Sequence, residues 1–281
     1  CLSRGLGDVY KRQGNYTLTS SNNSTTADIT AKSITGTITA ANKVYDGNTT
    51  ATTSASLSGL VIGDTVNLAS SGSFTDKNAA IGKTVNIVAG ALSGTDAGNY
   101  TLSSSNTTTT ANISAKAITA SGVNAQNKTY DGNTSATISG GTLNGVIGGD
   151  TVNLTSSGSF TDKNVANGKT VNISNTLSGT DANNYSISNS TTTANITAKG
   201  ITGTITAGNK VYDGNTTATT NGSLSGLIAG DTVTLTSSGS FTDKNAATGK
   251  TVNVVAGALS GADAGNYVLT GSNTTTTADI A

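Results

Sequence analysis

The sequence predicts an all-β fold built from tandem antiparallel β-sandwich domains. It contains no Glu and no Met and is rich in Thr, Ser, Asn and Gly, a composition that disfavours helices and favours strands joined by tight turns. Strand-like segments separated by turn signals follow one another at a spacing of roughly 10 residues, which is typical of sandwiches. One pattern of about 80 residues also occurs three times, and this period fits one small domain per copy.

Three short motifs define the copies. The motif Tyr-Asp-Gly-Asn-Thr begins at Tyr45, Tyr130 and Tyr212. The motif Phe-Thr-Asp-Lys-Asn begins at Phe74, Phe160 and Phe241. The third motif begins at Asp96, Asp181 and Asp263 and ends four residues later at Tyr100, Tyr185 and Tyr267.

The copies divide the chain into five segments. Residues 1–13 match no part of the repeat and contain both arginines and the only cysteine, so we interpret them as translated adapter sequence. Residues 14–31 match the C-terminal end of a preceding repeat. Three full copies follow, at residues 32–115, 116–198 and 199–281.

The first half of a copy contains two predicted strands and two predicted turns. In the first copy, Ile34 and Ile38 are an even number of residues apart and therefore lie on one face of the opening strand. Asp46 and Gly47 predict a turn of the kind found in β-hairpins. Residues 50–57 form the second predicted strand, and a Gly-Asp pair marks the turn that follows it.

The second half of a copy contains the remaining strands. One begins at residues 66–68, and another covers residues 84–88 with Val85 and Ile87 on the same face. Residues 100–102 and 108–113 complete six or seven short strands. The copies differ in length near the predicted turns, where insertions are tolerated, and this supports the strand assignments.

The third motif places a tyrosine at the start of a late strand. This spacing resembles the tyrosine corner of immunoglobulin-like domains, in which a tyrosine hydroxyl bonds to upstream backbone. Because the predicted core contains few aromatic residues, a fixed ring would contribute a large share of the buried area. We therefore expect immunoglobulin-like sandwiches in which the Tyr100 hydroxyl is bonded.

Four motifs in constant order resemble the YDG repeat domain. They are Lys-x-Tyr-Asp-Gly-Asn-Thr, Gly-Asp-Thr-Val, Phe-Thr-Asp-Lys-Asn and Leu-Ser-Gly-x-Asp-Ala-Gly-Asn-Tyr. The resemblance extends over residues 14–281. Such domains are found in tandem in large bacterial adhesins of the filamentous-haemagglutinin type. The resemblance implies a cell-surface or secreted protein of a Gram-negative bacterium, exported with an outer-membrane secretion partner. It implies no ligand and no catalytic residue.

The charge and residue types exclude several functions. Fifteen basic residues balance fifteen acidic residues, so no net field attracts nucleic acid or an anionic membrane, and we expect neither binding nor membrane insertion. The chain has no histidine, which removes nucleophile–His–acid catalysis and His-ligated metals. The Asp residues lie in predicted turns where they bond local backbone. We therefore expect no enzyme activity and no cofactor.

Two hypotheses concern the polar turns. Asp64, Asp76 and Asp96 offer oxygen ligands for a structural calcium ion, but the chain lacks an Asp-x-Asp-x-Asp spacing and a turn role explains each residue. Lys77 precedes Asn78, so a Lys–Asn isopeptide crosslink is an alternative. We favour a solvated Lys77, because nothing in the sequence indicates that it is buried.

The sequence favours a structural function. Tandem copies build length, and the few Tyr and Phe residues recur at core-like positions. Both features are expected of the stalk of a large adhesin, which projects a binding tip or itself adheres weakly through many copies. The alternative is a set of repeats that bind host or matrix glycans directly. Host or matrix glycans, proteins and neighbouring cells are the expected partners. A continuous β-solenoid is the rival fold, but its repeats are usually shorter than about 50 residues.

Overall fold

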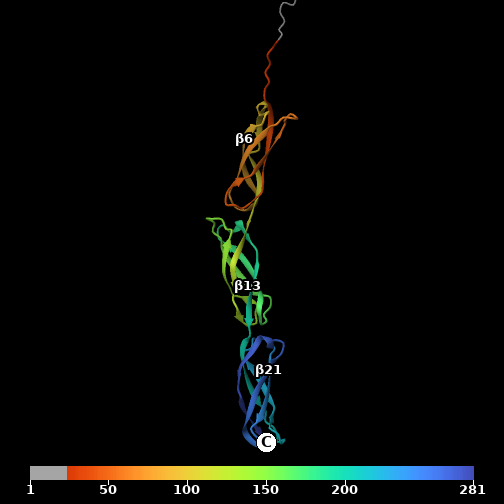
Figure 1. Cartoon of the computed structure of the whole chain (residues 1–281), viewed down its shortest axis with the longest axis vertical. Helices are drawn as coiled ribbons and strands as arrows, with labels where there is room; N and C mark the ends of the chain where they lie inside the picture. The colour runs from red at the N-terminus through yellow and green to blue at the C-terminus, as the bar shows by residue number, and fades with distance from the viewer. Residues whose placement is uncertain (1–23) are drawn as a thin grey trace, which may run out of the picture. The chain divides into compact units, whose positions relative to one another are not determined.

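A computed structural model describes residues 24–281, and its strands lie between Lys32 and Ile280 (Figure 1). The segment interpreted as adapter sequence, residues 1–13, lies outside the described residues. So do residues 14–23 of the segment interpreted as the end of a preceding repeat. Within the described range, the only helical elements are the short 3-10 turns η2 (Ala97–Asn99), η3 (Ala182–Asn184) and η4 (Ala264–Asn266). The predicted all-β class is confirmed.

The copies share one succession of strands, except that the third has only an isolated bridge at Lys210 where the other two have a second strand of two residues. The first copy has β1 (Lys32–Ala40), β2 (Lys43–Val44), β3 (Thr50–Ala51), β4 (Thr53–Ser58), β5 (Asn67–Phe74), β6 (Ala80–Ser93), β7 (Tyr100–Ser105) and β8 (Thr108–Ser114). The second has β9 (Lys116–Ala125), β10 (Lys128–Thr129), β11 (Ser135–Ala136), β12 (Ile138–Asn144), β13 (Asn153–Phe160), β14 (Ala166–Ser178), β15 (Tyr185–Ile187) and β16 (Ser190–Thr197). The third has β17 (Lys199–Ala207), β18 (Thr217–Ala218), β19 (Thr220–Ser225), β20 (Thr234–Phe241), β21 (Ala247–Ser260), β22 (Tyr267–Ser272) and β23 (Thr275–Ile280).

The strands of a copy form two sheets. In the second copy the strand orders are β12-β9-β15 and β10-β16-β14-β13-β11, and the first copy repeats them as β4-β1-β7 and β2-β8-β6-β5-β3. The third copy has β19-β17-β22 and β18-β20-β21-β23, and a parallel bridge from Lys210 to Ile280 extends the second of these sheets. The chain passes from one sheet to the other between β11 and β12, with only Thr137 between them.

The sheets are mixed, whereas the sequence predicted antiparallel ones. β9 pairs parallel with β15, with Lys116 opposite Tyr185, and β10 pairs parallel with β16. Parallel partners need a long connection, and these partners are separated by most of a copy. Alternation of residue types identifies a strand but not its partner, so the sequence could not reveal this pairing.

The turn at Asp46 and Gly47 does not close a hairpin, contrary to the predicted hairpin turn. The flanking strands β2 and β3 lie at opposite edges of the same sheet. Gly47 does adopt the left-handed backbone that such turns require, with φ of 81°. The prediction of a turn at Asp46 and Gly47 is therefore confirmed, whereas the prediction that its flanking strands pair as a hairpin was wrong.

Alternating apolar residues form the core. Ile34 and Ile38 are both buried on one face of β1, and Val85 and Ile87 are buried on one face of β6, as predicted. In the third copy, both sheets contribute to one core: Ile205 of β17 packs with residues of the other sheet, including Phe241 and Val252. Phe74 and Phe160 are buried at the corresponding positions of the other copies.

The contacts divide the chain into two compact units that cut across the first copy. Of the described residues, one unit contains residues 24–41 together with Thr50–Phe74 and Thr84–Thr110. The other contains Asn42–Thr49, Thr75–Lys83 and Ala111–Ala281. Two loops of the first copy thus belong to the same compact unit as the second and third copies.

We expect Gly179→Ala to lower the free energy of unfolding of the second copy by about 1–3 kcal/mol. Gly179 has φ of 114°, and an added Cβ would lie 2.4 Å from the carbonyl oxygen of Thr151. Gly148→Ala is the matched control, because Gly148 lacks a positive φ and its Cβ would meet nothing within 4 Å. Urea denaturation of both variants measures the difference, and equal stabilities would contradict this account of the turn.

Candidate functional site: the inter-repeat junctions

The most elaborate polar cluster of the described chain joins one copy to the next. Its centre is Asp150, in the turn between β12 and β13 of the second copy. The Asp150 N–H donates to the carbonyl of Ile147 at 3.1 Å, and the next N–H, of Thr151, donates to Asp181 Oδ2 at 2.9 Å. These bonds fix the turn, so the Asp150 carboxylate has a defined direction.

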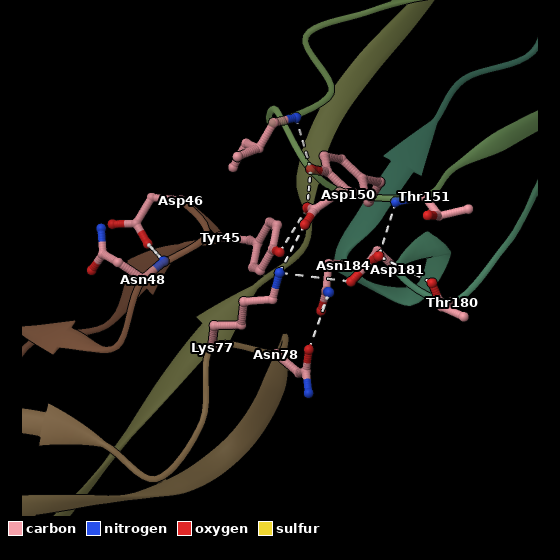
Figure 2. Close-up of polar contacts among 12 residues, drawn as sticks. Tyr45, Asp46, Asn48, Lys77, Asn78, Asp150, Thr151, Thr180, Asp181 and Asn184 are labelled. Carbon is pink, nitrogen blue, oxygen red and sulfur yellow. Dashed lines mark hydrogen bonds and ion pairs between the residues drawn. The ribbon is translucent and has the colours of Figure 1, made fainter.

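Donors from two copies converge on the Asp150 carboxylate (Figure 2). Oδ2 accepts the hydroxyl protons of Tyr45 at 2.7 Å and of Tyr185 at 2.6 Å. Oδ1 accepts a bond from Lys77 Nζ at 2.7 Å. Tyr45 and Lys77 come from loops of the first copy, whereas Tyr185 opens β15 of the second. The Asp150 side chain is only 3% exposed, so these three donors replace most of its water.

The same arrangement recurs between the second and third copies. Asp231 accepts the hydroxyl of Tyr130 at 2.8 Å, that of Tyr267 at 2.6 Å and the Lys163 ammonium at 3.0 Å. Its side chain is 4% exposed. Two junctions built from different stretches of sequence therefore have one geometry.

The paired tyrosines also contact each other through their rings. Tyr45 and Tyr185 lie edge to face, with ring centroids 5.4 Å apart and planes at 77°, and Tyr130 and Tyr267 show the same values. Such pairs contribute about 0.5–1.5 kcal/mol beyond the area they bury. Tyr212, at the same motif position in the third copy, is 51% exposed, in contrast to 1% for Tyr45.

A second set of bonds reinforces each junction. Asn184 Oδ1 accepts the N–H of Ala79 at 2.8 Å. The Asn184 Nδ2 donates to Asn78 Oδ1 at 3.2 Å (Figure 2). At the following junction Asn266 makes the equivalent bonds to Val165 and Asn164, at 2.9 Å and 3.2 Å. At both described junctions, the earlier copy thus presents Tyr, Lys and Asn, and the later copy presents Asp and Asn.

The junction shifts the pKa values of its members. Burial acts to raise the pKa of Asp150, but hydrogen bonds from Lys77, Tyr185 and Tyr45 outweigh it and lower the pKa to about 2. Burial, followed by the hydrogen bond to this carboxylate, raises the pKa of Tyr185 to about 12. The hydrogen bond to Asp150 raises the pKa of Lys77 above its ordinary value. At neutral pH the Asp150 carboxylate is therefore ionised, the Tyr185 hydroxyl keeps its proton and the Lys77 ammonium keeps its charge, as the junction requires.

The comparisons with known proteins identify the copies. A family model described as the YDG domain matches residues 25–110, 114–194 and 197–277. The chain belongs to the YDG domain family. No curated protein and no solved structure matches the chain.

The residues of the Tyr-Asp-Gly motif separate into two roles. Tyr45 and Tyr130 reach the next YDG domain, as described above. Asp46 stays local: its Oδ1 accepts the N–H of Asn48 at 3.1 Å and pairs with Lys43 at 2.7 Å. Asp131 and Asp213 make the same local contacts in their own copies, with Asn133 and Lys128 and with Asn215 and Lys210.

The aspartates of the third motif hold the turn that carries the junction carboxylate. Asp96 Oδ2 accepts the N–H of Thr65 at 2.8 Å, and Asp263 Oδ2 accepts that of Thr232 at 2.9 Å. Tyr100 donates its hydroxyl to Asp64 Oδ2 at 2.5 Å and accepts the N–H of Val61 at 3.0 Å. The tyrosine does bond to upstream backbone, but its proton goes to a carboxylate.

Lys77 is partly solvated, as expected, but its ammonium also makes a contact that the sequence did not predict. Its side chain is 38% exposed, and its ammonium lies against the Asp150 carboxylate and 3.7 Å from Asp181 Oδ1. The sequence alone did not reveal this role because the partner lies 73 residues further along the chain. The constant Asp-Lys-Asn and Gly-Asp-Thr-Val motifs were the available signals.

The structure brings no metal-binding cluster together in residues 24–281. No three His, Cys, Asp or Glu side chains gather there, and Asp76 pairs with Lys83 at 2.5 Å instead of joining Asp64 and Asp96. The same residues include no helix long and apolar enough to cross a membrane.

We expect Tyr45→Phe to lower the stability of the second YDG domain in the intact chain by about 1.5–3 kcal/mol, because a buried carboxylate loses one of its three donors. Tyr212→Phe removes the same hydroxyl at an exposed position and is expected to be nearly neutral. Urea denaturation measures both. Equal losses of unfolding free energy in the two variants would show that the bond from the Tyr45 hydroxyl to Asp150 does not stabilise the fold.

The contribution of Asp150 is expected to depend on pH in one direction. Its pKa falls from an ordinary 3.8 to about 2 on folding, so the stabilisation is complete above the ordinary pKa and is lost as pH falls through the lower value. The stability difference between the unmodified chain and Asp150→Asn should therefore shrink between about pH 4 and pH 2. A difference that stays constant down to pH 2 would contradict the assigned ionisation.

Proposed function

We propose that this YDG array is the spacer region, or stalk, of a large surface or secreted adhesin of the filamentous-haemagglutinin type. The observation that carries the proposal is the junction geometry, which occurs twice with the same donors, acceptors and ring contact. A spacer must transmit position from one domain to the next. Bonds from Tyr45 and Lys77 to Asp150 restrict how adjacent domains rotate about their short connection.

The proposed fold is an immunoglobulin-like sandwich in the broad sense of two sheets over one core. The shared core of β17 with β20 and β21 supports it, as does a tyrosine fixed at the start of a late strand. The parallel pairs of β9 with β15 and of β10 with β16 distinguish these YDG domains from purely antiparallel sandwiches.

We propose a cell-surface or secreted location in a Gram-negative bacterium, reached through an outer-membrane secretion partner. The resemblance of the motifs to the YDG repeats of such adhesins supports this location. We further propose that the array has no enzymatic activity, since its junction aspartates bind hydroxyls and ammonium groups of their own chain. The binding partners would then be host or matrix molecules, or neighbouring cells, contacted elsewhere or weakly through many copies.

Small-angle scattering tests the spacer function directly. Three domains with strands of about 40 Å, at about 3.3 Å per residue, should give a maximum dimension of at least about 120 Å. In the double variant Asp150→Asn, Asp231→Asn, adjacent domains should reorient. The maximum dimension should therefore fall, and the distribution of interatomic distances should become broader. A glycan array tests the competing function, and strong binding of one glycan by the array would favour it over the spacer.

A further inference from the structure

The second copy differs from its neighbours at one sheet edge. Nine positions separate Tyr185 from Ala194, whereas eleven separate Tyr100 from Ala111. The shorter segment shortens the strand that begins at the tyrosine. β15 has three residues, whereas β7 and β22 each have six.

In the first and third copies this edge is fully covered. β7 follows β1 as far as the pair of Gly36 and Ser105, and the Asn106 side chain then continues the ladder. Its Oδ1 accepts the N–H of Ile38 at 2.7 Å and its Nδ2 donates to the Ile38 carbonyl at 2.8 Å. Asn273 makes the same two bonds to Ile205, at 2.7 Å and 2.9 Å.

In the second copy the ladder stops early. β15 follows β9 only to the pair of Ile187 and Ile118. Val123 pairs with Gly140 as Ile38 pairs with Ala55, so it is the counterpart of Ile38. No side chain of residues 24–281 bonds to the backbone of Val123 as Asn106 does to that of Ile38.

Asn189, the counterpart of Asn106 in the second copy, bonds to β14 and not to β9. Asn189 Oδ1 accepts the N–H of Asn175 at 3.1 Å. The buried Asn175 amide is held in place by Ser156, whose hydroxyl donates to Oδ1 at 2.7 Å, and by the Ser188 carbonyl, which accepts from Nδ2 at 3.0 Å. These bonds hold the shortened loop away from the outer part of β9.

A cavity of about 280 Å³ lies beside the uncovered edge. It is lined by residues 117–120 of β9, by Asn175 of β14 and by residues 188–190. Ala120 is the counterpart of Gly36, whose neighbour in the first copy is Ser105. The cavity therefore takes the place of the strand residues that the second copy lacks.

We propose that this edge of the second copy binds an extended peptide, which adds to β9 as a parallel strand. Its side chains would be small and hydroxyl-bearing, with one Asn that bonds to Val123 as Asn106 bonds to Ile38. Strand addition supplies affinity through backbone hydrogen bonds and selectivity through the small spaces beside the edge. The sister copies show this chemistry, since Ser104-Ser105-Asn106 occupies the same edge there.

The local structure also sets the length of the peptide and the class of ligand. The pairing of β9 with β12 skips Gly122 and Gly141 without a change of register, and Gly122 has φ of 71°. The regular uncovered edge of β9 is therefore short, from Thr119 to Ser121, with Val123 just beyond it. A short peptide of weak affinity is therefore expected. No aromatic ring lines the cavity, so a sugar would lack a stacking platform.

The test is an NMR titration of the full chain with a synthetic peptide of residues 102–110. The amide signals of Thr119 to Val123 should shift, while those of the covered edges in the first and third copies stay in place. A peptide carrying Asn106→Asp cannot donate to the Val123 carbonyl, and it is expected to bind about tenfold more weakly, the effect of about one hydrogen bond.

Two chain variants complete the test. Replacing residues 188–190 with the sequence of residues 270–274 restores the length found in the third copy and should abolish the shifts by covering the edge. Val123→Pro removes the edge N–H and should abolish them as well, and the first variant decides the matter if the second does not fold.

Three outcomes would overturn the proposal. They are the absence of shifts at millimolar peptide, equal shifts in all three copies, and larger shifts of the same amides with N-acetylglucosamine than with peptide.

Discussion

The structure depends on a buried carboxylate that two neighbouring domains share. Removing a charge from water is costly unless donors replace the lost solvent. Asp150 has three such donors, and two of them, Tyr45 and Lys77, belong to the preceding domain. Neither domain satisfies the carboxylate alone, so the free energy of the buried charge favours the docked arrangement. Among residues 24–281, no buried side-chain nitrogen or oxygen lacks a partner.

This arrangement explains why the motifs recur in every copy. The second YDG domain contacts a neighbour on each side and uses different motifs for each. The tyrosine of Tyr-Asp-Gly and the lysine of Asp-Lys-Asn contact the following domain, while the aspartate of Gly-Asp-Thr and the Asn-Tyr pair contact the preceding one. The chain can extend copy by copy because one copy contains both halves of the junction.

The sequence predicted what depends on local pattern. Alternation placed Ile34 and Ile38, and Val85 and Ile87, on buried faces, and the structure confirms both pairs. The prediction of a turn at Asp46–Gly47 was also confirmed. Strand partners were not predictable, because β17 pairs parallel with β22 and the two strands are separated by most of a copy.

Long-range polar contacts were the least predictable part of the site. Lys77 reads as a solvated turn residue when only its neighbours in sequence are considered, and Asp150 reads as a turn residue for the same reason. Their roles in the junction become evident only from the structure, which brings these two residues together across 73 positions of sequence. The short loop after Tyr185 gave a length difference in the sequence, but only the register of β15 and β9 shows that it uncovers a sheet edge.

Residual dipolar couplings give the most direct test of the central claim that the shared carboxylate fixes adjacent domains. The backbone amides of the second and third copies, measured in the intact chain at neutral pH, should fit one alignment tensor. After Asp231→Asn the two copies should require separate tensors, while the couplings within each copy still fit its own structure. Separate tensors already in the unmodified chain, or one tensor retained in Asp231→Asn, would contradict the account.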